Sequence, residues 1–131
     1  MKGLIVDDLL ENRKLLNDYL QNRIPCDLTS NGPDALDLFQ DALADGDPYQ
    51  LVLLDIMMPE MDGQEVLLKM RALESQHGQS GPNEAIIIMV TAADSPRHVL
   101  DSFFKGGCSD YLEKPVTRQT LLETLAEYRL L

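Results

Sequence analysis

The chain has little of several features that would direct it to particular classes of protein. Its 131 residues include no tryptophan and only two cysteines, Cys26 and Cys108. The cysteines form no CxxC pair and have no histidine at zinc-ligand spacing, so neither a zinc site nor a disulfide framework is predicted. Few cysteines without such a pattern fit a reducing compartment, and we expect a cytoplasmic location.

Positive charge and long apolar runs are also scarce. The chain has 11 Lys and Arg against 22 Asp and Glu, a net charge of −11. Nucleic acids and anionic membranes both attract basic surfaces, so we expect this domain to bind neither directly. No apolar run approaches the about 20 residues of a membrane span. The start, Met1-Lys2-Gly3, leads into a strand-like run without the pattern of a signal peptide.

What the chain does contain is a regular alternation of short apolar runs with longer helical patterns. This alternation is typical of βαβ units and a parallel sheet. Its length fits one domain, residues 1–131. We therefore predict an α/β three-layer sandwich, with helices on both faces of a five-stranded parallel sheet and the weak second strand at an edge. The expected strands are Lys2–Asp7, Cys26–Thr29, Leu51–Asp55, Ile86–Val90 and Asp110–Leu112.

Five helices are expected between and after these strands. For the fourth helix, Ser95 is the predicted N-cap and Pro96 the first helical residue, and Phe104 is placed on its buried stripe. The polar segment His77–Asn83 is expected to be an exposed loop. The predicted helices cover about Leu9–Asn22, Asn31 to Gly46, Gly63 to about Gln76, Ser95 to Gly106, and Thr117–Arg129.

Polar side chains stand where four of the expected strands end. Asp7 and Asp8 follow the first apolar run, Asp55 the third, Thr91 the fourth and Lys114 the fifth. The carboxyl ends of parallel strands meet at one edge, which is where open α/β sheets place their ligand sites. We therefore expect three carboxylates, a hydroxyl and an ammonium group to share one small pocket.

That set of groups suits a divalent cation and a phosphoryl group. Carboxylate oxygens are the ligands that Mg²⁺ prefers, and Mn²⁺ accepts the same ligands. Without a cation the carboxylates repel one another, and at least one pKa should rise. Asp55 is the best candidate nucleophile for forming an acyl phosphate. Lys114, which a cis peptide to Pro115 could aim into the pocket, and Thr91 would contact phosphoryl oxygens.

The segments that carry these residues resemble the receiver domain of two-component response regulators. The matching pieces are Leu4–Asp8, Leu53–Gly63, Val90-Thr91-Ala92 and Asp110–Pro115. They follow one another in order, and the resemblance covers the whole chain. It implies a flavodoxin-like fold with strand order 2-1-3-4-5, like that of the single-domain chemotaxis regulators.

The resemblance also implies roles for individual residues. Asp55 would accept a phosphoryl group from a histidine kinase or histidine phosphotransfer protein. Asp7, Asp8, Asp55 and the Met57 backbone carbonyl would organise the magnesium ion. The chain would be a signalling switch that catalyses only its own phosphorylation and dephosphorylation.

Further positions match the family's switch. Thr91 would turn toward the phosphoryl group, and small Ala92 beside it would leave that group room. Tyr111 would swing inward and reshape the surface made by the fourth helix, fifth strand and fifth helix, although a half-buried strand aromatic needs no such role. That surface would meet a downstream protein or another domain of the parent protein, and homodimerisation is a family possibility.

Several alternatives stay open. The sequence stops at Leu131 just after the last expected helix, so we expect no output domain in this chain, either as a stand-alone regulator or as a receiver from a larger protein such as a hybrid kinase. A degenerate receiver could act only as a docking module. An aspartate-nucleophile phosphohydrolase usually has a second aspartate where this chain has Met57. A flavodoxin-type electron carrier needs a phosphate loop where this chain has Asp7-Asp8-Leu9-Leu10.

Overall fold

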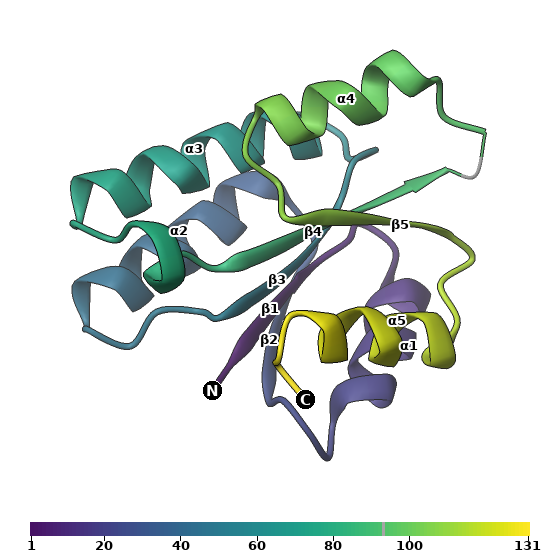
Figure 1. Cartoon of the computed structure of the whole chain (residues 1–131), viewed down its shortest axis with the longest axis horizontal. Coiled ribbons are helices and arrows are strands. Elements are labelled where there is room, and N and C mark those ends of the chain that lie inside the picture. Colours follow the sequence, from purple (N-terminus) through teal and green to yellow (C-terminus); the bar gives the residue numbers. More distant parts are fainter. Residues whose placement is uncertain (93) are drawn as a thin grey trace.

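The computed structural model describes residues 1–92 and 94–131. One sheet of five parallel strands has the order β2-β1-β3-β4-β5, which confirms the predicted order and the edge position of β2. Figure 1 shows α2, α3 and α4 over one face of the sheet and α1 and α5 over the other, so the predicted three layers are also confirmed. The strands are β1 Gly3–Val6, β2 Cys26–Thr29, β3 Leu51–Asp55, β4 Ile86–Ala92 and β5 Asp110–Lys114. The helices are α1 Leu10–Leu20, α2 Gly32–Ala44, α3 Gly63–Gln76, the short 3-10 helix η1 Gly81–Asn83, α4 Arg97–Lys105 and α5 Arg118–Glu127.

The central strands are apolar throughout because both of their faces are buried. Alternate residues of β3 enter two separate cores: Val52 and Leu54 pack under α2, α3 and α4, whereas Leu51 and Leu53 pack under α1 and α5. Both cysteines are free thiols, in line with the expected absence of disulfides. Within the described residues, no helix is both long enough and apolar enough to cross a bilayer.

The ends of β4 and β5 differ from the prediction. Both strands were expected to stop earlier, at Val90 and Leu112. In the structure Thr91 pairs with Glu113 and Ala92 with Lys114, so both strands continue for two more residues. Thr91 and Lys114 are therefore held in the sheet ladder rather than in loops.

The predicted start and buried face of α4 were partly wrong. The N-cap position belongs to Pro96 and not to Ser95, and no side chain caps the helix. Ser95 does not cap because its hydroxyl is bonded to Thr91 instead. Phe104, expected in the core, is 47% exposed, because its neighbour Phe103 takes the inward position one helical step earlier.

Other boundaries shift by a few residues. The first helix is shorter than expected, since Gln21–Arg23 form a turn. The last helix begins after Thr117, whose hydroxyl caps it by accepting the Thr120 N–H at 3.1 Å. The segment His77–Asn83 is mostly exposed, as expected, but its last three residues form η1.

Candidate functional site

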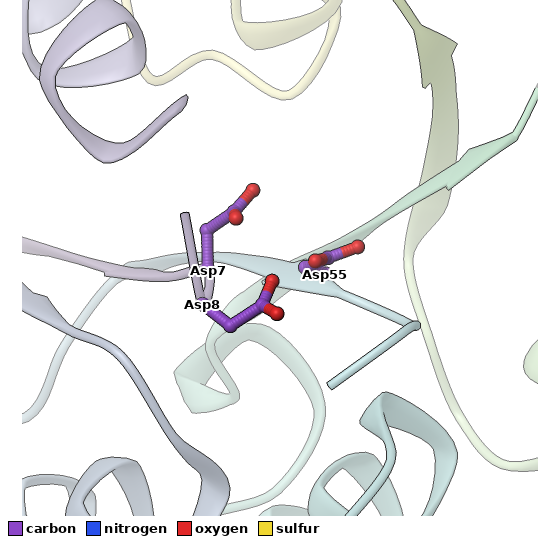
Figure 2. A group of neighbouring side chains, drawn as sticks. All are labelled: Asp7, Asp8 and Asp55. Atoms are coloured by element: carbon purple, nitrogen blue, oxygen red, sulfur yellow. The ribbon is translucent and has the colours of Figure 1, made fainter. Parts of the chain in front are cut away.

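Three acidic side chains meet at the carboxyl edge of the sheet (Figure 2). The pairing of β1 with β3 sets Val6 beside Leu54, so that Asp7 follows one strand where Asp55 ends the next. One carboxylate oxygen from each of Asp7, Asp8 and Asp55 lies within 4.8 Å of the others. Hard anionic oxygens at this separation are a suitable ligand set for a divalent cation.

Asp55 is buried, being only 2% exposed, and has one basic neighbour. The Lys114 ammonium nitrogen lies 3.1 Å from Asp55 Oδ1, and the Met57 N–H donates to the same oxygen at 3.4 Å. Burial and the charge of Asp7 raise the pKa of Asp55 above its ordinary value, although Lys114 acts in the opposite direction. The site therefore has more negative charge than its own lysine compensates.

Asp7 is fixed by its surroundings. Its Oδ1 accepts the Leu9 N–H at 2.9 Å, and the Arg13 guanidinium donates to its backbone carbonyl at 2.7 Å. Arg13 was missed at the sequence level because its partner is a backbone atom, which no residue pattern marks. The side chain of Asp8, which is half-buried, completes the acidic group.

A cavity of about 330 Å³ opens beside Asp55. Thr91 and Lys114 line it, together with Met57, Ala92 and Ser95. The buried Thr91 hydroxyl lies 2.6 Å from the Ser95 hydroxyl. The cavity can accept a phosphoryl-sized group between the carboxylate, the ammonium group and the hydroxyl.

The other residues predicted for the site are Met57, Tyr111 and Pro115, and they differ in exposure and in what they contact. The Met57 side chain is 76% exposed, which leaves only its backbone near the acidic group. Tyr111 is half-buried on β5, where its ring packs against Phe104. The Lys114–Pro115 peptide is cis, and Pro115 lines a neighbouring cavity of about 300 Å³ together with Asp7.

Gly63 brings α3 against the backbone of Asp55. A Cβ atom at this position would lie 2.5 Å from the Asp55 carbonyl oxygen, closer than real Cβ contacts allow. The Gly63 N–H donates to the Ile56 carbonyl at 2.9 Å, which fixes the loop between β3 and α3. Glycine is therefore required for the position of the backbone that carries Asp55.

The family model of the response regulator receiver domain matches residues 4–126. The chain belongs to this family. Its fold is the CheY-like, flavodoxin-like fold that the sequence predicted.

Three relatives illustrate the range of proteins that contain a similar receiver domain. Hybrid signal transduction histidine kinase L of Dictyostelium discoideum is 35% identical over 129 residues, which are 97% of this chain but 7% of that protein. Chemotaxis protein CheY4 of Vibrio cholerae has a TM-score of 0.78 at 28% identity, covering 99% of this chain and 98% of that one. The receiver domain of Ssk1 from Saccharomyces cerevisiae, solved with the phosphotransfer protein Ypd1, has a TM-score of 0.83 at 27% identity, covering 98% and 88%.

The sequence predicted correctly that the charged groups of this receiver domain lie together at the carboxyl end of the strands. It did not predict which residues position Thr91 and the Asp55 backbone. Ser95 was assigned to helix capping, a role that its residue type also favours. Gly63 was seen only as the end of a loop. Both roles depend on contacts across the fold, and a single sequence contains no direct signal for those.

Proposed function

We propose that this receiver domain accepts a phosphoryl group on Asp55 in a magnesium-dependent reaction and changes its α4–β5–α5 surface in response. The observation that carries the proposal is the buried Asp55 carboxylate, which lies beside two further carboxylates and lines a cavity together with Lys114. The donor would be a histidine kinase or a histidine phosphotransfer protein. Membership of the family supports this donor class, as does the solved pair of Ssk1 and Ypd1.

In the transfer step, an Asp55 carboxylate oxygen attacks phosphorus. The bond from phosphorus to the donor imidazole nitrogen breaks, and that nitrogen leaves with the electron pair. Lys114, already 3.1 Å from Asp55 Oδ1, pairs with a phosphoryl oxygen, and the Thr91 hydroxyl donates to another. Phosphoryl transfer depends mainly on such positioning and charge neutralisation.

The acidic group fits a magnesium ion. Its three carboxylates gather oxygen ligands within 4.8 Å, and burial followed by the charge of Asp7 raises the pKa of Asp55, two effects that a bound cation would oppose. Asp7, Asp8, Asp55 and the Met57 backbone carbonyl would hold the ion, with Mn²⁺ as a substitute. When bound, Mg²⁺ would neutralise charge on the phosphoryl oxygens.

The signalling step would use Thr91 and Tyr111. Thr91 lines the cavity next to Ala92, which carries no side chain large enough to fill the space for the phosphoryl group. Tyr111 lies on β5, where its ring packs against Phe104 of α4. The changed surface would meet a downstream protein, a neighbouring domain of a parent protein or a second copy of the chain, in the cytoplasm.

Two other functions are less well supported by the site. A phosphohydrolase needs a proton donor near the leaving group, and the thioether of Met57 offers none. A purely docking receiver would not need a buried Asp55 carboxylate that the partly exposed Lys114 leaves incompletely neutralised. We propose a switch and not an enzyme that acts on free phosphate esters.

The proposal is tested by incubating the protein with acetyl phosphate in the presence of Mg²⁺, Mn²⁺ or a chelator. An adduct that hydroxylamine removes should form with either metal, because hydroxylamine cleaves acyl phosphates, and peptide mapping should place it at Asp55. Formation with the chelator present would contradict the metal requirement. Steady turnover of p-nitrophenyl phosphate would favour the phosphohydrolase.

A further inference from the structure

The α4 segment touches both side chains that the proposed switch would move. Just before α4, the Ser95 hydroxyl lies 2.6 Å from the Thr91 hydroxyl. In the last turn of α4, the Phe104 ring meets the Tyr111 ring edge-on, with centroids 6.0 Å apart and an interplanar angle of 74°. One helix and its N-terminal flank (Figure 1) therefore contact a residue of β4 and a residue of β5.

Either hydroxyl can be the donor in the Thr91–Ser95 bond, and in both cases the bond holds the Thr91 side chain turned toward Ser95. The Thr91 backbone is fixed in the sheet opposite Glu113, so the hydroxyl changes partner mainly by rotation of the side chain. Ser95 and Asp55 line the same cavity. A phosphoryl oxygen on Asp55 would therefore compete with Ser95 for the Thr91 hydroxyl.

Ser95 is placed for this contact and not for helix capping. Its N–H donates to the Ala92 carbonyl at 3.2 Å, which links Ser95 to the end of β4. Serine is a preferred N-cap residue, yet α4 has no side-chain cap and Pro96 occupies the cap position. The hydroxyl thus stabilises the position of Thr91 and not the helix end.

Phe104 likewise contributes little to the core. Phe103 beside it is buried, whereas Phe104 is nearly half exposed and contacts Tyr111. Edge-to-face aromatic pairs are favourable beyond the area that they bury. The contact therefore favours the arrangement in which Tyr111 lies against α4.

We propose that Ser95 and Phe104 are two latches that hold the unphosphorylated domain in its resting arrangement. Ser95 does so by engaging the Thr91 hydroxyl, and Phe104 by keeping the Tyr111 ring against α4. This rests on the proposed function, since it assigns the regulation of the same site. Removal of either latch weakens the resting state and leaves Asp55, Lys114 and the acidic group intact, so the population shifts toward the active arrangement.

The size of the shift follows from the contacts removed. A neutral hydrogen bond changes an equilibrium by about two- to twelvefold, and an aromatic pair has a similar effect. By linkage, a ligand that prefers the active arrangement binds more tightly by the same factor. Beryllium fluoride, which mimics the phosphoryl group on a carboxylate, is such a ligand.

The test compares Ser95→Ala, Phe104→Ala and the double variant with the unmodified protein. Labelling by acetyl phosphate with Mg²⁺ is followed by intact mass, and beryllium fluoride binding by fluorine NMR. Each single variant should label faster and reach half-saturation at a lower beryllium fluoride concentration, by about two- to twelvefold. The effects should multiply in the double variant until the active arrangement predominates.

Two matched controls separate the latches from general loosening. Ser102→Ala removes a hydroxyl bond of the same length, from Ser102 Oγ to the Val99 carbonyl, within α4. Leu68→Ala removes a large exposed side chain from α3. Both controls should label and bind as the unmodified protein does.

The outcomes test the two latches and the proposed function separately. If the unmodified protein labels but Ser95→Ala behaves like Ser102→Ala, the Ser95 latch is wrong, and slower labelling would mean that Ser95 supports Thr91 in the active arrangement. Equal behaviour of Phe104→Ala and Leu68→Ala would overturn the Phe104 latch. If the unmodified protein neither labels nor binds beryllium fluoride, the proposed function fails, and the latches fail with it.

Discussion

The two ends of the parallel strands differ in how their buried charges are paired: the charges at the amino end have partners within the protein, and those at the carboxyl end do not all have them. At the edge where β4 and β5 begin, Glu74 of α3 is 2% exposed and fully paired. Arg71 donates to Glu74 at 2.7 Å, to the Ala85 carbonyl at 2.9 Å and to the Gly107 carbonyl at 2.8 Å. Glu74 in turn accepts the Ala85 N–H at 2.6 Å. Each charge here has several fixed partners from the protein itself.

Neighbouring bonds extend this network across the same edge. The Ser109 hydroxyl accepts the Ile87 N–H at 3.0 Å, and the Tyr128 hydroxyl donates to the Ser109 carbonyl at 2.7 Å. Burial, followed by the charge of Asp110, raises the pKa of Tyr128 to about 12, so the hydroxyl keeps its proton at neutral pH. The bonds join α3, β4, β5 and the end of α5 into one fixed unit.

The opposite edge has a surplus of charge instead. Three carboxylates share this edge with Lys114, and the pKa of Asp55 is raised. The comparison indicates that a buried carboxylate stabilises the fold only where the protein supplies its partners. Where it does not, the group remains available to a cation and a phosphoryl group.

The largest loss of stability is expected from a change to Glu74, at the amino end of the strands. Glu74→Ala leaves Arg71 without its carboxylate and the Ala85 N–H without its acceptor, and should lower the free energy of unfolding by about 3 kcal/mol. Urea unfolding measures this change. Labelling by acetyl phosphate, per folded molecule, should stay close to that of the unmodified protein.

Glu84→Ala is the matched control for Glu74→Ala. Glu84 is more exposed and lies 3.9 Å from Arg71, so its loss should cost about 0.5 kcal/mol or less. Equal losses for the two variants would mean that burial of the carboxylate does not distinguish them, which would contradict the comparison of the edges.

A change at the carboxyl end of the strands, beside Asp55, should affect the rate of labelling more than the free energy of unfolding. Lys114→Ala removes the ammonium group that would pair with a phosphoryl oxygen, and labelling should slow by about 100-fold. Because the Lys114 side chain is partly exposed, its ion pair with the buried Asp55 should contribute little to the free energy of unfolding. Lys105→Ala, an exposed lysine at the end of α4, should label normally. Equal rates for both variants would remove Lys114 from the mechanism.

Gly63→Ala should lower both the free energy of unfolding and the rate of labelling. The added Cβ clashes with the Asp55 carbonyl, which should cost about 2 kcal/mol and slow labelling by displacing Asp55. Gly46→Ala is the comparison variant, because Gly46 has a positive φ of 74° and no neighbour within 4 Å of the added Cβ. It should destabilise the fold by about 1 kcal/mol through backbone strain and leave the labelling rate unchanged. Slower labelling in Gly46→Ala would show that destabilisation alone explains the effect.

The smallest expected effect is on the pH dependence of the free energy of unfolding, measured in the absence of a metal ion. Because the folded-state pKa of Asp55 is raised, the folded protein keeps a proton that the unfolded chain has already released. The contribution of Asp55 to stability is therefore complete below its ordinary pKa and is lost as the pH rises through the raised pKa. Asp55→Asn should lack this loss in urea unfolding from acid to neutral pH. Parallel pH profiles for the two proteins would contradict a raised pKa.

The sequence was most informative where a pattern repeats. Apolar runs and helical periodicity predicted the order of elements, and the polar residues Asp7, Asp55 and Thr91 marked the edge that holds the site. The repeated pattern places side chains on faces, and strand ends in a parallel sheet have one direction, so these features follow from local rules.

The features that were missed depend on contacts across the fold. Ser95 and Phe104 each had a common local role, as a cap and as a core aromatic, and a partner on another element changed it. Glu74 was not expected to be buried, because its partners Arg71 and Ala85 come together only when α3 meets β4. Local propensity cannot predict such contacts.

The most direct test of the central claim is intact-mass spectrometry after incubation with Mg²⁺ and acetyl phosphate, beside Asp55→Asn. One added phosphoryl group on the unmodified protein and none on the variant is the predicted result. An adduct that persists in Asp55→Asn would place the nucleophile elsewhere. If the unmodified protein shows no adduct and also fails to bind beryllium fluoride, Asp55 is not a phosphoryl acceptor.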